Sequence, residues 1–256
     1  MININEKFYK LATLLIILCF CFVVTGCKKN VQSSQDGWTC TWGTVNTGNF
    51  CGNCGKQKGE YTQKQATNSN PFKNAKVGDY VKFGNYPQTE EGEEKPIEWQ
   101  VLAKEANKML VISEYGLDAK RFDDDSNVWA NSEIRQWLNG EFYNKAFNGK
   151  ERKLINSSNL SDADAGTSDN VFLLSKEEAE KYFVDDEARR CKATDYAKNN
   201  GAYVNSDNGY SYWWLRSPNP YGSNYVYGVF SDGYIDYFSN VNLDDFLARP
   251  ALWINL

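Results

Sequence analysis

Two apolar runs near the C-terminus constrain the fold more than any other feature of the chain. Residues 212–218 (Tyr-Trp-Trp-Leu-Arg-Ser-Pro) and 249–256 (Arg-Pro-Ala-Leu-Trp-Ile-Asn-Leu) combine aromatic and aliphatic side chains with a Pro near one end, which is the pattern of buried strands. The segment that they bracket, 217–248, contains no Lys, Arg, Glu, Gln, Met or Trp. We therefore predict two rigid strands that frame a displayed segment, with the flanking Arg216 and Arg249 in structural roles.

The bracketed segment has the composition of a binding surface. Tyr and Phe provide large flat contact areas with few torsions, and Asn, Asp and Ser provide short hydrogen-bonding groups. A core would not hold so many Asn and Asp side chains without partners. The alternative is a Tyr-rich sheet that binds nothing. We predict ligand contacts by Asn219, Tyr221, Asn224, Tyr225, Tyr227, Phe230, Asp232, Tyr234, Asp236, Tyr237 and Asn240.

A tight hairpin is predicted inside this segment, because Asp232 and Gly233 form a favoured two-residue turn. Strand alternation after the turn places Ile235 and Tyr237 on one face, and it places Tyr234, Asp236 and Phe238 on the other. Since one face of such a strand must pack against the domain, only part of the aromatic set is expected to reach a ligand.

The bulk composition excludes several function classes. The net charge is −5 and the pI is about 5.0, which argues against a nucleic-acid partner. The chain contains no His, so it has neither the commonest general base nor any His-ligated metal site. We expect a binding protein rather than an enzyme.

The N-terminal residues 1–26 have the anatomy of an export signal. Lys7 and Lys10 precede an apolar run, residues 11–24, which is shorter than the roughly 20 residues of a membrane-spanning helix. The run ends in Val-Thr-Gly-Cys at 24–27, which resembles the lipobox of bacterial lipoproteins. The resemblance implies cleavage before Cys27, a lipid on its sulfur and anchoring at the outer face of the cell envelope, with 27–36 as a tether.

Residues 37–58 resemble a short zinc ribbon in which one of the two Cys knuckles is damaged. Cys51 and Cys54 form an intact knuckle, but Cys40 lacks its partner because Trp42 stands where the second thiol belongs. Structural zinc sites are almost always four-coordinate. The alternatives are a degenerate ribbon that binds zinc weakly and a Cys pair oxidised outside the cell. Residues 59–76 are polar and are predicted to be a linker.

The main domain is predicted to span 77–256 and to be α+β. Strands are expected at 79–84, 97–102 and 109–113, and helices at 131–138, 142–147 and, from a capping box, 175–182. Cys191 lies beside three cationic residues, which would lower the pKa of its thiol, although packing on a helix is the favoured interpretation. A calcium site at Asp162, Asp164 and Asp169 is a weaker alternative, since the ligand spacing is not fixed.

Several motifs together resemble an uncharacterised domain-of-unknown-function family of bacterial surface proteins. They are Phe-Gly-x-Tyr-Pro-Gln (83–88), Ile-Arg-x-Trp-Leu-Asn (134–139), Val-Phe-Leu-Leu-Ser (171–175), Trp-Trp-Leu-Arg-Ser-Pro (213–218) and Arg-Pro-Ala-Leu-Trp (249–253). The resemblance covers roughly 77–256 in order. It implies no particular activity.

The layout is also similar to C-type-lectin-fold proteins, including variable receptors diversified by diversity-generating retroelements. That resemblance implies short helices around a small antiparallel sheet and a variable segment near the C-terminus. Diversified Asn codons never yield Lys, Glu, Gln, Met or Trp, and all five are absent from 217–248. The expected function is binding of a protein or peptide, or of a glycan. The alternatives are an enzyme similar to formylglycine-generating enzymes, which share a related fold, and a structural envelope lipoprotein.

Overall fold

The computed structural model describes residues 38–39, 45–50, 70–161 and 166–256 and divides the chain into two units, 1–68 and 69–256. In the first unit, β1 (Trp38–Thr39) pairs antiparallel with β2 (Val45–Asn46). The predicted export signal, Cys27 and the three cysteines of the predicted ribbon, Cys40, Cys51 and Cys54, lie outside the described residues.

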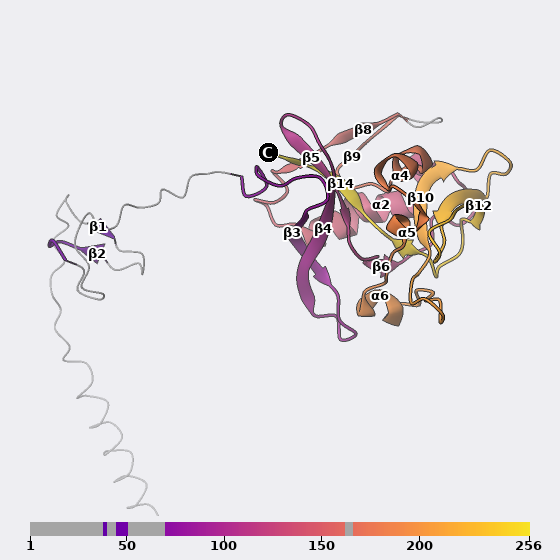
Figure 1. The fold of residues 1–256 in the computed structure, drawn as a ribbon, viewed down its shortest axis with the longest axis horizontal. Helices are drawn as coiled ribbons and strands as arrows, with labels where there is room; N and C mark the ends of the chain where they lie inside the picture. The colour runs from indigo at the N-terminus through magenta and orange to yellow at the C-terminus, as the bar shows by residue number, and fades with distance from the viewer. Residues whose placement is uncertain (1–37, 40–44, 51–69, 162–165) are drawn as a thin grey trace, which may run out of the picture. The chain divides into compact units, whose positions relative to one another are not determined.

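The second unit is α+β, as predicted, and consists mostly of strands with a few short helices (Figure 1). Its first sheet is antiparallel throughout, with the order β3-β4-β5-β14-β7. Four of these strands contain the apolar runs that predict them. The strands are β3 (Tyr80–Pro87), β4 (Glu94–Lys104), β5 (Lys108–Ser113), β14 (Ala251–Asn255) and β7 (Ile155–Asn156).

The second sheet carries the bracketed segment and has the order β12-β11-β10-β13-β6. Its strands are β10 (Trp213–Pro218), β11 (Tyr225–Val229), β12 (Ile235–Asn240), β13 (Leu247–Ala248) and β6 (Asp118–Ala119). The short β13 pairs parallel with β10, whereas the other pairings are antiparallel. The domain therefore has two five-stranded sheets instead of one small antiparallel sheet. A separate pair is formed by β8 (Ser158–Leu160) and β9 (Thr167–Asp169).

The helices are short, and their caps follow the sequence closely. Ser175 forms the predicted capping box with Glu178 at the start of α4 (Lys176–Tyr182). The helix expected from Asn131 is instead capped by Ser132, which is an equally good cap type one residue later. The helices are η1 (Trp129–Asn131), α2 (Glu133–Trp137), η2 (Leu138–Phe142), α3 (Tyr143–Ala146), α5 (Asp186–Arg189) and α6 (Asp195–Asn199). The break predicted between 138 and 142 is absent, because the π-helical η2 joins α2 and α3 into one continuous helical stretch.

The core holds the tryptophans of the two C-terminal runs. Trp213, Trp214 and Leu252 are fully buried, whereas Trp253 is half-buried under the Lys108 ammonium group. Phe72 also belongs to this core, and the Asn70 side chain donates to the carbonyl oxygen of Asn255. The folded unit thus includes residues that we assigned to the linker.

Among the residues that the structure describes, no helix has the length and apolar character needed to cross a membrane.

Candidate functional site

The loop between β10 and β11, residues 219–224, is held in place by a buried side chain from a distant part of the chain. Asn127 Nδ2 lies 2.9 Å from the carbonyl oxygens of Gly222 and Tyr225 and 3.3 Å from that of Asn219. The Asn127 backbone N–H also donates to the Ser223 carbonyl oxygen at 2.7 Å. These bonds fix the loop conformation without ligand. The sequence carries no local signal for this role, because Asn127 lies in an irregular stretch and acts across more than ninety residues.

Asn219 is a second support of the same loop rather than an open contact residue. Its side chain is buried, with 4% of its surface exposed. Its Oδ1 accepts the Tyr221 N–H at 2.6 Å, and its Nδ2 donates to the Tyr237 carbonyl oxygen on β12. The loop is therefore tied both to Asn127 and to the edge strand of the sheet, and we assign Asn219 to positioning.

Beside this loop lies a row of three aromatic rings, which we call the tyrosine row: Tyr221, Tyr237 and Tyr227. Tyr221 is exposed, whereas Tyr237 and Tyr227 are half-buried. Tyr221 has 79% of its surface exposed, and its ring centroid lies 6.1 Å from that of Tyr237. Tyr227 lies 6.3 Å from Tyr237 on the neighbouring strand. An open hollow of about 570 Å³ at Tyr221 is lined by Asn127 and residues 218–223. The row offers an apolar face with polar rims.

Helix α4 ends the tyrosine row at the opposite side from Tyr221. The Lys176 ammonium lies 5.8 Å over the Tyr227 ring and forms an ion pair with Glu180 at 2.7 Å. The Lys176 N–H also donates to Ser217 Oγ at 2.9 Å, which joins the start of α4 to the end of β10. A cation over this ring shows that the tyrosine face accepts positive charge. Lys176 has no counterpart in the site predicted from sequence.

A β-bulge in β12 aims Tyr237 at its two neighbours. Val226 pairs with Ser239 and Gly228 pairs with Asp236, so Tyr227 lies opposite two residues, 237 and 238. Bulges commonly redirect a side chain beside a functional site. A hairpin forms before β12, as predicted, but its loop has three residues, 231–233, instead of two. The Phe230 N–H donates to the Tyr234 carbonyl oxygen at 2.9 Å, and the Gly233 N–H donates to the Phe230 carbonyl oxygen at 2.8 Å. Gly233 has φ of +92°, and a Cβ there would overlap the Asp186 carbonyl oxygen.

The remaining predicted contacts divide between the surface and the packed interior. Tyr234 has 53% of its surface exposed at the turn, where its N–H donates to Asp232 Oδ1 at 3.0 Å. Phe230 packs on Tyr212 with ring centroids 4.7 Å apart, so this ring serves mainly the interior. The half-buried set consists of Asn224, Tyr225, Asp236 and Asn240.

Arg216 and Arg249 have structural positions, as expected. Arg216 Nη1 donates to the Leu173 carbonyl oxygen at 2.6 Å and pairs with Glu178. Arg249 Nε donates to the Ser113 carbonyl oxygen at 3.0 Å, and its guanidinium lies 4.9 Å from the Trp213 ring. Both cations are buried and fully occupied with protein groups, which leaves them unavailable as ligand clamps.

Cys191 is not a reactive thiol of the kind that its basic neighbours suggest. The residue follows α5 instead of lying on a helix, and it is completely buried. Burial raises the pKa of the Cys191 thiol, although Arg249 opposes the shift. The neutral thiol is a packing group, because the nearby positive charges do not offset the loss of solvent.

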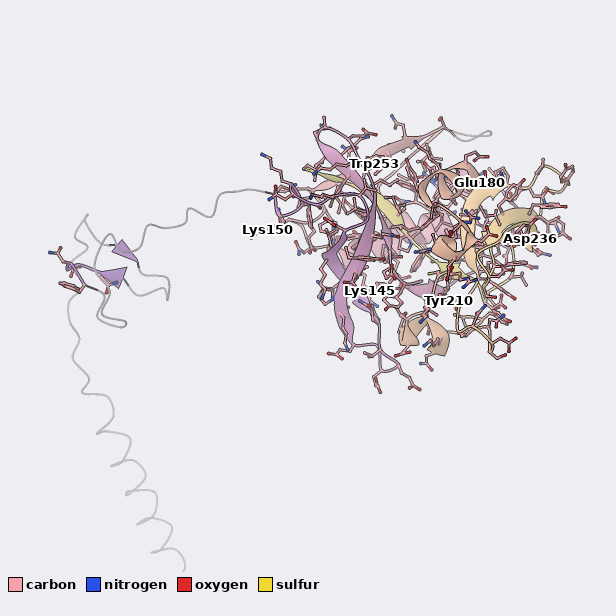
Figure 2. The ribbon with its side chains drawn as sticks, in the orientation of Figure 1. Lys145, Lys150, Glu180, Tyr210, Asp236 and Trp253 are labelled. Carbon is pink, nitrogen blue, oxygen red and sulfur yellow. The ribbon has the colours of Figure 1, made fainter. Side chains whose placement is uncertain are left out.

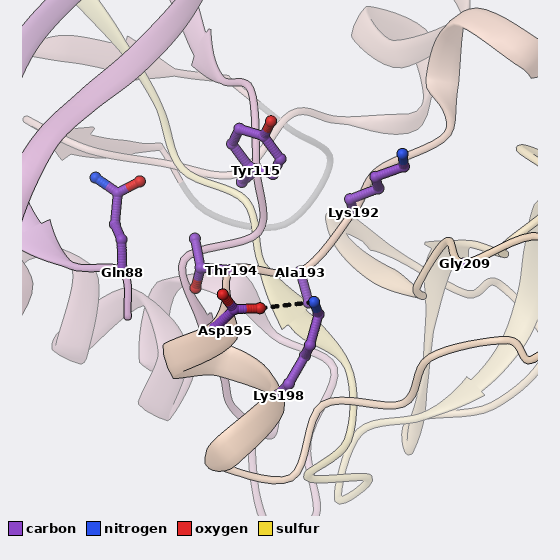
Figure 3. Close-up of a pocket in the computed structure, with 8 residues that line it drawn as sticks. All are labelled: Gln88, Tyr115, Lys192, Ala193, Thr194, Asp195, Lys198 and Gly209. Carbon is purple, nitrogen blue, oxygen red and sulfur yellow. Dashed lines mark hydrogen bonds and ion pairs between the residues drawn. The ribbon is translucent and has the colours of Figure 1, made fainter. Parts of the chain in front are cut away.

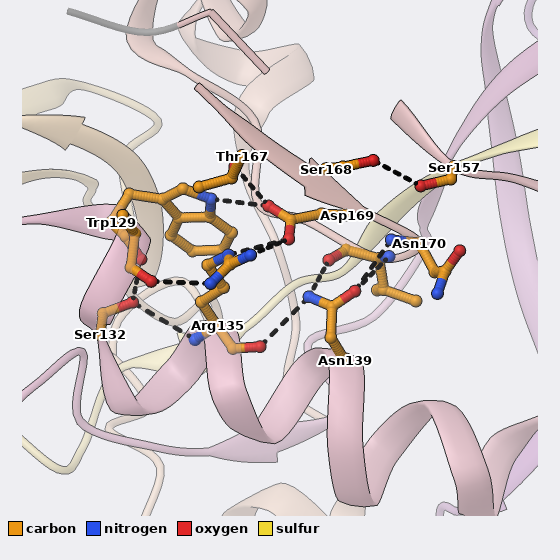
Figure 4. A network of polar contacts seen from close by, with 11 residues as sticks. Trp129, Ser132, Arg135, Asn139, Ser157, Thr167, Ser168, Asp169 and Asn170 are labelled. Carbon is orange, nitrogen blue, oxygen red and sulfur yellow. Dashed lines mark hydrogen bonds and ion pairs between the residues drawn. The ribbon is translucent and has the colours of Figure 1, made fainter. Parts of the chain in front are cut away.

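Asp169, one of the three candidate calcium ligands, is committed to protein partners (Figure 4). Its carboxylate oxygens lie 3.0 Å from Trp129 Nε1, 2.8 Å from Thr167 Oγ1 and 2.7 Å from Arg135 Nη2. A carboxylate held by an arginine has little capacity left for a cation. Asp162 and Asp164 lie outside the described residues, within which no group of His, Cys, Asp and Glu side chains has the arrangement of a metal site.

A second hollow, of about 300 Å³, opens between α6 and the Gln88 and Tyr115 side chains (Figure 3). Its polar groups are largely paired within the protein. Lys198 bonds Asp195 at 2.8 Å, and Thr194 Oγ1 accepts the Ala197 N–H as the cap of α6. Lys192 Nζ lies 5.4 Å over the Tyr210 ring. This hollow lacks the displayed rings of the tyrosine row.

Comparison with known proteins gives a family but no solved relative. The family model named DUF6273, a domain of unknown function, matches residues 106–256. The match begins in the turn between β4 and β5 and includes the whole second sheet and the tyrosine row. No curated protein and no solved structure matches the chain. Since the match covers more than half of the chain, the chain belongs to the DUF6273 family.

Proposed function

We propose that the domain binds a protein or peptide partner through the tyrosine row. The observation that carries the proposal is the loop 219–224, whose fixed backbone presents Tyr221 with 79% of its surface exposed. The buried side chains of Asn127 and Asn219 hold this loop, so specific hydrogen bonds within the domain keep the Tyr221 ring on the surface. This support favours a role for Tyr221 in contact with a partner.

The arrangement suits recognition because the loop and its tyrosine rings lose little conformational entropy on binding. Tyr has only two side-chain torsions, and the contact between Tyr221 and Tyr237 restricts them further. A loop that is already fixed loses little conformational entropy when a partner covers it. Central aromatic residues of protein interfaces commonly contribute about 2 kcal/mol or more to binding. The half-buried Asn224, Asp236 and Asn240 surround the rings with hydrogen-bonding groups, which supply specificity.

The location that fits this role is the outer face of the bacterial cell envelope. Cys27, directly after the predicted export signal, would carry the lipid, and residues 27–68 would hold the domain away from the membrane. Residues 37–58 would act as a spacer of degenerate zinc-ribbon type. The domain itself would be a C-type-lectin-like scaffold, and the amino-acid usage of 217–248 supports diversification by a retroelement.

The test is photo-crosslinking of the protein to its partner on living bacterial cells. The full-length protein would carry a photo-crosslinking phenylalanine derivative at position 221, and crosslinked products would be identified by mass spectrometry. The matched control places the same derivative at Tyr80, which has 51% of its surface exposed on β3 at the edge of the other sheet. We expect a discrete protein adduct from position 221 and none from position 80.

The same experiment in a Tyr227→Ala background should reduce the adduct yield about tenfold, as expected for loss of a central interface tyrosine. Equal yields from positions 221 and 80 would contradict the proposal. An adduct that disappears after glycosidase treatment of the cells would assign the site to a glycan instead.

A further inference from the structure

The tyrosine row adjoins an open sheet edge. Strand β12 is the last strand of its sheet, in the order β12-β11-β10-β13-β6, and within the described residues no strand pairs with its outer side. The same strand carries Tyr237, the middle ring of the row, and Asp236 at the margin of the folded unit (Figure 2). An unpaired edge presents a row of backbone donors and acceptors, which is a template for an added strand.

The register shows which backbone groups face that edge. The Phe230 N–H donates to the Tyr234 carbonyl oxygen at 2.9 Å, so these two residues form a hydrogen-bonded pair. Because such pairs alternate in an antiparallel ladder, the next pair, Val229 and Ile235, is not bonded. The N–H and C=O of Ile235 therefore point away from β11 towards the open edge.

The charge around this edge selects for a positively charged partner. The hairpin that contains β11 and β12, residues 225–240, has two carboxylates, Asp232 in the turn and Asp236 on β12, and no Lys or Arg. Arg190 Nε donates to the Asp232 carbonyl oxygen at 3.2 Å, so the negative charge on the edge strand is that of Asp236. Asp236 lies on the edge strand itself. A charged residue at such a position opposes pairing with neutral or acidic strands, whereas a cationic residue opposite it is stabilising. Pairing with a second copy of this chain would bring two acidic edges together.

The rings favour the same class of ligand. Lys176 already lies over the face of Tyr227, which demonstrates a cation position on the tyrosine row. Tyr221 stands at the other end of the row, with most of its surface exposed. A strand laid along β12 would have Tyr237 directly beside it, and alternate side chains of that strand could reach the rings.

We propose that the partner contributes an extended, basic segment that adds to β12 as a further strand. Because Asp236 and Tyr237 are neighbours on β12 and face opposite sides of the sheet, adjacent Arg or Lys side chains of the partner would contact Asp236 on one face and the tyrosine row on the other. This inference rests on the proposed function, because it describes how the same surface holds its partner. Backbone pairing along β12 supplies affinity, and the spacing of cationic side chains supplies specificity.

The experiment begins with selection from a random library of peptides of about ten residues, long enough to span β12, on the immobilised full-length protein. We expect enriched peptides to carry Arg or Lys at adjacent positions, one for each face of the sheet. The best peptide would then be labelled and its affinity measured by fluorescence anisotropy.

Charge reversal gives the first check. Asp236→Lys should weaken this peptide about tenfold and should strengthen the variant peptide in which each Arg or Lys is Glu. The control is Glu91→Lys, which makes the same charge change on an exposed residue of the loop between β3 and β4. It should leave both affinities unchanged.

Backbone methylation gives the second check. N-methylation of alternate peptide residues in one set should abolish binding, whereas methylation of the other set should not, since only one set faces the edge. The inference would be overturned if the selection recovered no peptide, or only acidic or neutral peptides. It would also be overturned if both methylated sets had the same effect on binding. A dimer that Asp236→Lys dissociates would overturn it as well. In each case, a crosslinked partner at position 221 would still leave the proposed function in place.

Discussion

Strands β10 and β12 lie two positions apart in one sheet and both contain aromatic residues, but the rings of the two strands differ in burial. On β10, Trp213 and Trp214 are fully buried, and their indole N–H groups donate to the carbonyl oxygens of Arg189 and Lys120 at 3.0 and 2.7 Å. On β12, Tyr237 is half-buried in a row that ends in an exposed ring. Aromatic content alone therefore does not distinguish a buried central strand from a half-buried edge strand.

The position in the sheet explains the difference. β10 is central, and α4 packs against it, so both of its faces are covered. β12 is an edge strand, and α4 reaches only as far as the Lys176 contact with Tyr227. Trp donates one hydrogen bond that a buried carbonyl can accept, whereas a Tyr hydroxyl can remain in water while its ring contributes contact area. The choice of Trp inside and Tyr outside follows from these properties.

The largest effect on the free energy of unfolding is expected from removing an aromatic ring of β10. Trp214 stacks on Phe246 with centroids 4.1 Å apart, and no part of its surface is exposed. Trp214→Ala should lower the free energy of unfolding by about 3–5 kcal/mol, as for other large-to-small core changes. Urea denaturation measures the change. The control is Tyr234→Ala at the exposed turn before β12, which should cost far less. Similar losses for the two variants would contradict the distinction between buried and exposed rings.

A smaller effect is expected from the loop support. Asn127→Ala removes the donor to three backbone carbonyls and should lower the free energy of unfolding by roughly 1–3 kcal/mol. It should also loosen the loop locally, so hydrogen exchange should accelerate at the amides of residues 219–225 and stay unchanged on β10.

The control for Asn127 is Asn144→Ala, since Asn144 Nδ2 makes one exposed bond to the Gly140 carbonyl oxygen at 2.8 Å. It should cost much less and leave the loop amides protected. If Asn127→Ala also preserved that protection, the loop would owe its conformation to other contacts, and the argument for a prepared surface would lose its main support.

The sequence predicts what depends on local pattern. The apolar runs predict β10 and β14, the Asp-Gly pair predicts the hairpin before β12, and the capping box at Ser175 predicts α4. Each of these signals involves residues within a few positions of one another. The cap at Ser132 differs from the prediction by one residue because Asn and Ser are both good caps.

The sequence does not predict what depends on long-range contacts. Asn127 and Asn219 are ordinary polar residues until the fold brings them beneath the loop, and Asn219 then proves to be a support. The basic neighbours of Cys191 predict a lowered thiol pKa, but burial, which sequence proximity does not report, raises it. Composition predicted a binding role for the whole aromatic segment, and only the fold separates the exposed Tyr221 from the half-buried Phe230, which packs on Tyr212.

The smallest effect on stability is expected at the most exposed ring. Tyr221→Ala should change the free energy of unfolding by less than about 0.5 kcal/mol, because an exposed side chain makes few contacts with the rest of the folded protein. Tyr80→Ala, at a half-exposed ring on the edge strand β3, should behave similarly. Only partner binding should separate the two variants, with Tyr221→Ala losing it and Tyr80→Ala keeping it. If Tyr221→Ala instead destabilised the domain as much as Trp214→Ala, the ring would belong to the core, and the contrast between β10 and the tyrosine row would disappear.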